Sequence, residues 1–188
     1  CKHPWHFHLD ADERFTANLV REIFEQVGPD GSASPHAAYM VPSEMIFLGK
    51  WLKHAGGYPA YQVRLFRYGK CRFTDYGHGQ REQTDGKIGR FTQPYLHYSF
   101  SKGLYDWLDK HNKYSSLEAL QVVAARREKV GVRDLISHDP VRRRRTWKEF
   151  GYRLPLRPFL RWFVTMFVSG GVFEGRAGWT YARLLATY

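Results

Sequence analysis

Residues 1–15 read CKHPWHFHLDADERF and contain the first elements of the predicted fold. From Trp5 to Leu9, large apolar residues alternate with histidines, and this two-residue period predicts a buried β-strand. From Phe15 to Val27, apolar residues recur at helical spacing, with Thr16 as the expected N-cap and Gly28 as the expected stop. The sequence therefore predicts a strand, an acidic turn and a helix in direct succession.

Further strands are predicted downstream of this unit. Their patterns cover residues 38–48, 62–68 and 94–100. The first two are separated by the sequence HAGGYP, residues 54–59, which we call the glycine loop. Two successive glycines let a backbone approach a ligand closely. Strands combined with a helix in this order predict an α/β fold.

After residue 100 the pattern changes from strand to helix. One helix is predicted from Leu104 to Tyr114 and a second from Ser116 to Ala125. We therefore divide the chain into a sheet part, residues 1–100, and a basic helical part, residues 101–188.

Basic side chains concentrate in the helical part. Residues 1–100 carry 12 Lys or Arg against 10 Asp or Glu, whereas residues 101–188 carry 17 against 8. Such a segment attracts polyanions, either nucleic acid or an anionic lipid surface. The apolar run Trp162–Val168 is far shorter than the ~20 residues of a spanning helix. An amphipathic helix in the membrane interface, with Phe163 and Phe167 in the acyl boundary, is the expected structure.

Composition and spacing argue against several other classes of protein. The hydrophobic content of 43% is too high for a disordered chain, and the N-terminal stretch lacks the layout of a signal peptide. Cys1 and Cys71 form no disulfide framework, which favours a reducing compartment. No residue completes a zinc spacing with His3, His6 and His8. Secretion and a structural zinc site are therefore not expected.

Two aspartates follow the first predicted strand. Asp10 and Asp12 can turn toward one point where the chain leaves the sheet, and two hard oxygen ligands suit Mg²⁺ or Mn²⁺ bridging a diphosphate. Such triplets are also common in solvated turns and at helix N-termini. Taken alone, the pair favours the solvated turn.

Three further side chains are candidates for chemistry. Glu82 offers a carboxylate base, with a surface ion pair as the alternative. His97 offers a further metal ligand, with a hydrogen-bonded core histidine as the alternative. Arg64 is expected on the strand face opposite Val63 and Leu65, where it points either at an anionic ligand or at solvent.

Several segments, taken in order, resemble bacterial family 2 glycosyltransferases of exopolysaccharide and lipopolysaccharide assembly. They read LDADER, KHAGGYPAYQVRLFRYGKCRF, YGHGQRE and GKIGRFTQPYLHYSFSKGLYDWLDKHNKYSSLEA, and the tail GGVFEGRAGWTYARLLATY resembles the family's closing helices. The resemblance covers essentially the whole chain. It implies the C-terminal part of a GT-A fold, a mixed sheet followed by amphipathic C-terminal helices.

The resemblance also implies a function. It implies metal-dependent, inverting transfer of a sugar from a nucleotide-sugar donor to a lipid-linked or saccharide acceptor. The enzyme would work peripherally at the cytoplasmic face of the bacterial inner membrane, against an anionic lipid surface. Asp10 and Asp12 match the family's metal-binding motif, for Mn²⁺ or Mg²⁺, and His97 resembles a histidine that ligates this metal or touches the diphosphate.

The remaining matches concern the substrates and the base. Gly56 and Gly57 match a glycine loop near donor and acceptor, and Glu82 falls where the catalytic base is expected. In many relatives a histidine directly precedes the glutamate, whereas here three residues separate His78 from Glu82. Relatives also carry a nucleotide-binding half of about 80 to 100 residues before the acidic motif, and we expect that this half is missing from the present sequence.

Two other functions compete with the transferase. A basic nucleic-acid-binding module is suggested by the arginine run Arg142–Arg145, interleaved with Trp147, Phe150 and Tyr152. The second alternative is that the chain is an inactive, membrane-associated fragment. The acidic pair and the glycine loop are not needed for nucleic-acid binding, so they favour the transferase without a nucleic-acid partner.

Overall fold

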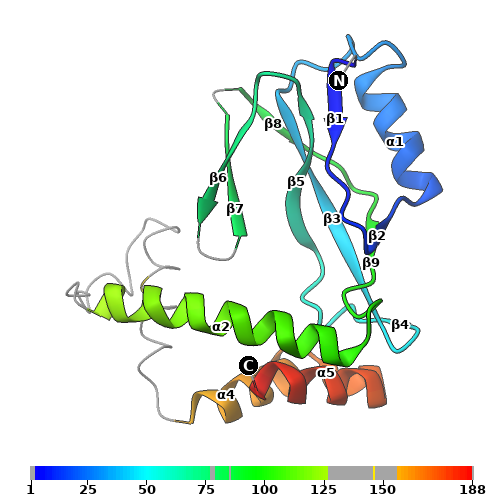
Figure 1. Ribbon diagram of the computed structural model, residues 1–188. Coiled ribbons are helices and arrows are strands. Elements are labelled where there is room, and N and C mark those ends of the chain that lie inside the picture. Colours follow the sequence, from blue (N-terminus) through cyan, green and yellow to red (C-terminus); the bar gives the residue numbers. More distant parts are fainter. Residues whose placement is uncertain (1–2, 77–78, 85, 127–145, 147–155, 188) are drawn as a thin grey trace.

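The chain folds as an α/β protein with a curled mixed sheet and C-terminal helices (Figure 1). The computed structural model describes residues 3–76, 79–84, 86–126, 146 and 156–187. The sequence-predicted arginine run Arg142–Arg145 and its interleaved aromatics Trp147, Phe150 and Tyr152 lie outside these residues.

Within the described ranges, the main sheet has seven strands and both parallel and antiparallel pairs. Its path runs β1-β5-β3-β9-β2, with β4 and β8 also paired to β3. β3 is parallel to β8 and β9 and antiparallel to β4 and β5. The strands are β1 Trp5–Phe7, β2 Glu13–Arg14, β3 Ala38–Phe47, β4 Lys50–Trp51, β5 Ala60–Arg67, β8 Ile88–Arg90 and β9 Tyr95–His97.

Two strands form a separate antiparallel hairpin, β6 Arg72–Tyr76 and β7 Gly79–Gln83. The ring of Phe73 packs against the rings of Phe66 and His8, which joins the hairpin to β5 and to the chain after β1. The hairpin therefore lies over the sheet beside β5 (Figure 1).

Helix α1, Ala17–Val27, confirms the predicted helix and its caps. The Thr16 hydroxyl accepts the Leu19 N–H at 3.1 Å, and the Gly28 N–H donates to Phe24 O with a φ of 80°. Leu19 and Val27 are buried against Tyr39 and other residues of the sheet. Burying one apolar stripe of α1 builds the main core on this face of the sheet.

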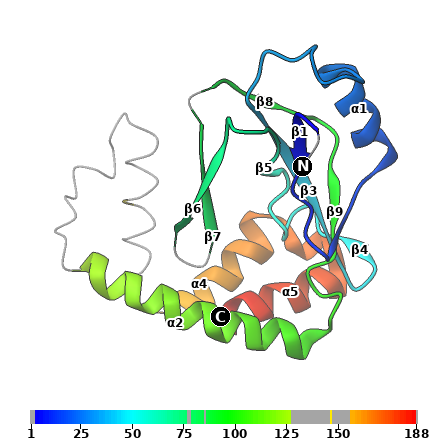
Figure 2. The same cartoon turned by 45° about the horizontal axis from the view of Figure 1, so that its top comes forward.

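The helical part lies across one end of the sheet (Figures 1 and 2). It comprises α2 Leu104–Arg126, α4 Arg157–Phe163, the π-helical turn η2 Val164–Val168, the 3₁₀ turn η3 Gly171–Glu174 and α5 Gly175–Thr187. One hydrophobic cluster joins Phe47 and Leu52 of the sheet part to Ala177 and Tyr181 of α5. Residues on both sides of position 100 thus share a core.

The structure corrects two predictions about elements. The two helices predicted from Leu104 to Ala125 are one helix, because the hydroxyls of Ser115 and Ser116 donate to Asn112 O inside the helix and do not cap a new one. The buried strand predicted up to Leu9 ends at Phe7. Because β1 has only β5 as a neighbour among the described strands, its apolar side chains are only partly covered.

Candidate functional site

A β-bulge in β5 sets the position of Arg64. Tyr39 pairs with Leu65 and Met40 pairs with Val63, so Arg64 is an extra residue without a partner on β3. Val63 and Leu65 consequently belong to different core clusters, and the predicted arrangement with both opposite Arg64 is wrong. The bulge turns the Arg64 side chain toward the acidic turn that follows β1.

Arg64 is the centre of a polar network that is buried at Glu13 and exposed at Asp10. Its Nη2 donates to the carboxylates of Glu13 and, at 3.2 Å, of Asp10. Its Nε lies 3.4 Å from the Tyr95 hydroxyl, which donates in turn to Gln62 Oε1 at 3.2 Å. The Glu13 side chain is 0% exposed, and Arg64 is therefore the cation that allows this carboxylate to be buried.

Burial and neighbouring charges shift the pKa values of Glu13 and Arg64 in opposite directions. Burial raises the pKa of Glu13, although the Asp10 N–H and the Arg64 guanidinium lower it. Burial also lowers the pKa of Arg64, but the Tyr95 hydroxyl and both carboxylates outweigh it, and the net pKa is raised. The network therefore keeps a permanent positive charge at Arg64 beside the acidic turn.

Asp12 and His97 face each other at the rim of this network. Asp12 Oδ2 lies 3.6 Å from His97 Nε2, and the two side chains are 25% and 29% exposed. β2 and β9 hold them together, because Glu13 pairs with His97 and the Tyr98 N–H donates to Asp12 O. The sequence prediction placed both residues in one metal site, and the structure brings them together.

These two side chains suit a divalent cation that is completed by other ligands. Carboxylate oxygen and imidazole nitrogen are both donors for Mn²⁺, and Mg²⁺ often takes one or two carboxylates plus phosphate oxygens. Asp10, the third predicted ligand, is paired with Arg64 instead. Among the described residues, no group of three His, Cys, Asp or Glu side chains could hold a metal ion. Asp12 and His97 are therefore a pair of metal-donor side chains without a third protein donor beside them in the described ranges.

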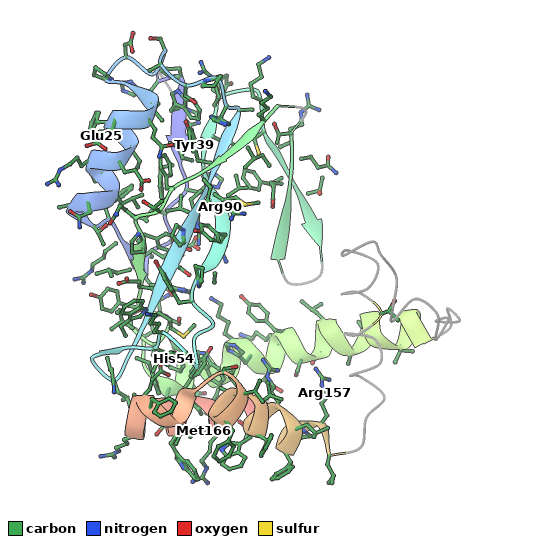
Figure 3. The ribbon with its side chains drawn as sticks, turned by 180° about the vertical axis from the view of Figure 1, so that it is seen from behind. Glu25, Tyr39, His54, Arg90, Arg157 and Met166 are labelled. Atoms are coloured by element: carbon green, nitrogen blue, oxygen red, sulfur yellow. The ribbon has the colours of Figure 1, made fainter. Side chains whose placement is uncertain are left out.

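Gly56 and Gly57 of the predicted glycine loop lie between β4 and β5. A Cβ on Gly56 would meet Leu52 O at 2.3 Å, and Gly57 has a φ of 71°. Both glycines are therefore required by the turn itself. The loop sits where the end of the sheet meets the C-terminal helices, as the position of His54 shows (Figure 3).

Glu82, the predicted base, lies on β7 of the hairpin opposite Phe73. It is partly exposed, and its charge contributes, after burial, to the raised pKa of the Cys71 thiol. No contact between Glu82 and Asp10, Asp12 or His97 occurs in the described part of the chain. The predicted base thus lies on the β6–β7 hairpin, whereas the predicted metal ligands Asp10 and Asp12 lie in the acidic turn after β1.

A second carboxylate, Glu44 on β3, escaped sequence reasoning. It pairs in register with Leu96, one residue before His97, and burial raises its pKa. Its charge also adds to the burial that raises the pKa of Tyr58 in the glycine loop. A single carboxylate inside the apolar strand AYMVPSEMIF was the signal that could have identified it.

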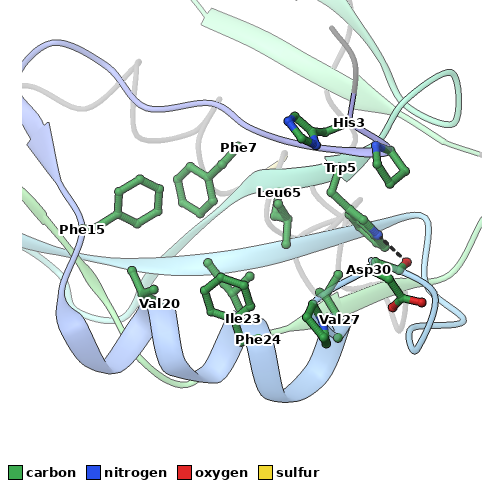
Figure 4. Close-up of a pocket in the computed structure, with 14 residues that line it drawn as sticks. His3, Trp5, Phe7, Phe15, Val20, Ile23, Phe24, Val27, Asp30 and Leu65 are labelled. Carbon is green, nitrogen blue, oxygen red and sulfur yellow. Dashed lines mark hydrogen bonds between the residues drawn. The ribbon is translucent and has the colours of Figure 1, made fainter.

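An apolar groove of about 570 Å³ lies between β1 and α1 (Figure 4). Trp5, Phe7 and Phe24 line it, and the Trp5 indole N–H donates to Gly31 O at 2.9 Å. Its lining is mostly apolar, and His3 and Asp30 are the ionisable side chains among the residues that line it.

No protein-family model matches the chain, and no solved structure matches it. The case for function therefore rests on the residues and their geometry.

Proposed function

We propose that this chain is the acceptor-side part of a GT-A-type, family 2 glycosyltransferase that uses a divalent cation. The observation that supports this most is the pairing of Asp12 with His97 at 3.6 Å, next to the cationic Arg64. A nucleotide-sugar carries a diphosphate, and a divalent cation held by two protein donors would keep coordination positions open for its oxygens.

The proposed reaction transfers one glycosyl group. A hydroxyl oxygen of a lipid-linked or saccharide acceptor attacks the anomeric carbon, the bond from this carbon to the diphosphate oxygen breaks, and the nucleoside diphosphate leaves with the bonding electrons. The carboxylate of Glu82 takes the hydroxyl proton, and single displacement inverts the anomeric carbon.

The protein groups have distinct roles in this proposal. Asp12 and His97 would hold Mn²⁺ or Mg²⁺, which neutralises charge on the leaving diphosphate. Arg64 holds Asp10 and Glu13 in place, so the acidic turn keeps its shape beside the two proposed metal ligands. Gly57, where an added Cβ would have no neighbour within 4 Å, would let the acceptor approach the backbone of the glycine loop.

An anionic bilayer is the proposed surface on which the enzyme works. No helix in the described part of the chain is long and apolar enough to cross a membrane. The α4–α5 face, as we name residues 156–187, instead exposes large apolar side chains. Its exposed members are Leu156, Phe159, Leu160, Phe163, Val164, Phe167, Val168, Val172, Phe173 and Trp179. Together with the arginines of these helices, such a face fits an interfacial location at the inner membrane.

The experiment that tests the function is a transfer assay with Mn²⁺ and a panel of UDP- and GDP-sugars. Release of nucleoside diphosphate that requires both Mn²⁺ and Asp12 supports the proposal, with Asp106→Asn on the exposed surface of α2 as the matched control. Turnover that persists in Asp12→Asn would refute the metal site, and binding of RNA or DNA without any nucleotide-sugar turnover would favour a nucleic-acid-binding module.

A further inference from the structure

Glu174 connects the start of the glycine loop to the C-terminal helices through hydrogen bonds. Its carboxylate accepts the His54 N–H at 2.7 Å and the Ala55 N–H at 3.0 Å, and the residue is only 4% exposed. Lys50 Nζ also donates to the Glu174 carbonyl oxygen at 3.1 Å. Hydrogen bonds to an ionised carboxylate are stronger than neutral ones. The loop backbone is therefore tied to η3, more than a hundred residues along the chain.

Packing around Glu174 leaves little room for the helices to shift against the loop. A Cβ on Gly171 would lie 2.8 Å from Thr165 O and 3.3 Å from Ala55 Cβ. A Cβ on Gly178 would lie 2.2 Å from Gly171 O. Because closely packed backbone contacts transmit displacement, η2, η3 and α5 should move together with the glycine loop.

The same short turn that carries Glu174 inward presents apolar side chains outward. Phe173 is 82% exposed and Val172 is 45% exposed. Residues 156–187 contain four arginines and a single acidic residue, and that residue is the buried Glu174. The exposed part of the α4–α5 face is consequently apolar and cationic, which complements an anionic lipid surface.

We propose that Glu174 is a positioning residue that couples docking of the α4–α5 face onto an anionic bilayer to the conformation of the glycine loop. The inference rests on the membrane location in the proposed function. Lipid contact at Phe173 holds η3 in place, and η3 holds the His54 and Ala55 amides through Glu174. The glycine loop is thereby ordered where a lipid-linked acceptor would arrive.

The test is amide hydrogen exchange at His54 and Ala55, measured by NMR on the full chain. Phosphatidylcholine vesicles with and without phosphatidylglycerol serve as the probe. In the wild type, vesicles containing phosphatidylglycerol should slow exchange at both amides. Glu174→Gln replaces one acceptor oxygen by a donor that faces a backbone N–H, so exchange should rise at least about tenfold. The vesicle effect should then disappear although flotation persists.

Glu22→Gln is the matched control, because the Glu22 carboxylate also binds two consecutive amides, those of Thr92 and Gln93. It should open those amides and leave His54 and Ala55 unchanged. Phe173→Ser supplies a second variant that keeps the Glu174 bonds. It should show wild-type exchange without vesicles and a weakened vesicle effect.

Three results would overturn the coupling. They are wild-type protection of His54 and Ala55 in Glu174→Gln, a vesicle effect that survives in this variant, and a wild type that floats without slower exchange. A wild type that fails to float overturns the membrane docking as well. Amide exchange and flotation can be measured whether or not the chain transfers a sugar. The coupling through Glu174 and the glycosyltransferase activity can therefore be refuted independently.

Discussion

Arg64 is ion-paired with Glu13, a carboxylate whose side chain is 0% exposed, and it reaches Glu13 from a bulge in β5. The acidic turn after β1 is therefore built on a buried charge pair. Removing one partner of such a pair leaves the other charge buried and unpaired, which is more damaging than removing both. The pair fixes Asp10 and, through β2, the neighbouring Asp12.

Replacing Arg64 should destabilise the fold strongly. Arg64→Met leaves Glu13 without its cation and should lower the free energy of unfolding by about 3 kcal/mol. Urea unfolding measures this change. The double variant Arg64→Met with Glu13→Gln should recover part of the loss, and Arg21→Met on the exposed side of α1 should change stability by less than about 0.5 kcal/mol. Equal losses in Arg64→Met and Arg21→Met would contradict the network.

Glu13 should also give the stability a characteristic pH dependence. Because its pKa is raised in the folded state, the folded protein holds the proton more tightly than the unfolded chain. The stabilisation that protonated Glu13 gives the fold is fully present at a pH below 4.5, the ordinary pKa of a glutamate. It is lost as the pH rises through the pKa of Glu13 in the folded state. The free energy of unfolding of the wild type minus that of Glu13→Gln should therefore fall as the pH rises from 4.5 through the pKa of the folded state. A difference that grows over this range would show that the Arg64 ion pair outweighs burial.

Two carboxylates on different strands, Glu82 on β7 and Glu44 on β3, are compared as the general base. Glu82→Gln should lower the rate of sugar transfer by roughly 10²–10⁴-fold, as expected for loss of a general base. Glu44→Gln retains that base and serves as the comparison. Should the loss occur in Glu44→Gln instead, the base lies on β3, and the raised pKa of Glu44 would appear as a shifted acidic limb of the pH–rate profile.

The α4–α5 face should control vesicle binding. Phe167 and Val168 are 52% and 72% exposed on η2, and replacing both by serine should reduce flotation with anionic vesicles at least about tenfold. Phe24→Ser is the control, since Phe24 is 58% exposed on α1 at the other end of the sheet. Equal flotation of the two variants would contradict a specific lipid-binding face.

Local patterns predicted α1 and the strands β1, β3, β5 and β9, but not β2, β4, β8 or the β6–β7 hairpin. Thr16 and Gly28 cap α1 as expected, and β3 begins at Ala38 as predicted, because caps and strand alternation are short-range properties. The proximity of Asp12 and His97 was expected from a family resemblance, and no local pattern contains it. Sequence reasoning therefore identified the candidate residues but could not test their grouping.

Long-range features were beyond the sequence. The bulge at Arg64 depends on pairing between β3 and β5, so a two-residue period placed Val63 and Leu65 wrongly on one face. Glu174 lies more than a hundred residues from His54 and Ala55 in the sequence, and only the fold brings it to their backbone N–H groups. The same is true of Glu44, whose burial depends on its neighbours in space.

The most direct test of the account is Mn²⁺ binding to this chain, followed by electron paramagnetic resonance of the free ion. Mn²⁺ should bind at a single site, more tightly when UDP or GDP is present, because Asp12 and His97 supply only two protein donors. Asp12→Asn and His97→Gln should each weaken binding by about 10–100-fold, whereas Asp106→Asn should not. Binding that is absent, or that is unchanged in both variants, would contradict the claim that Asp12 and His97 share a divalent cation.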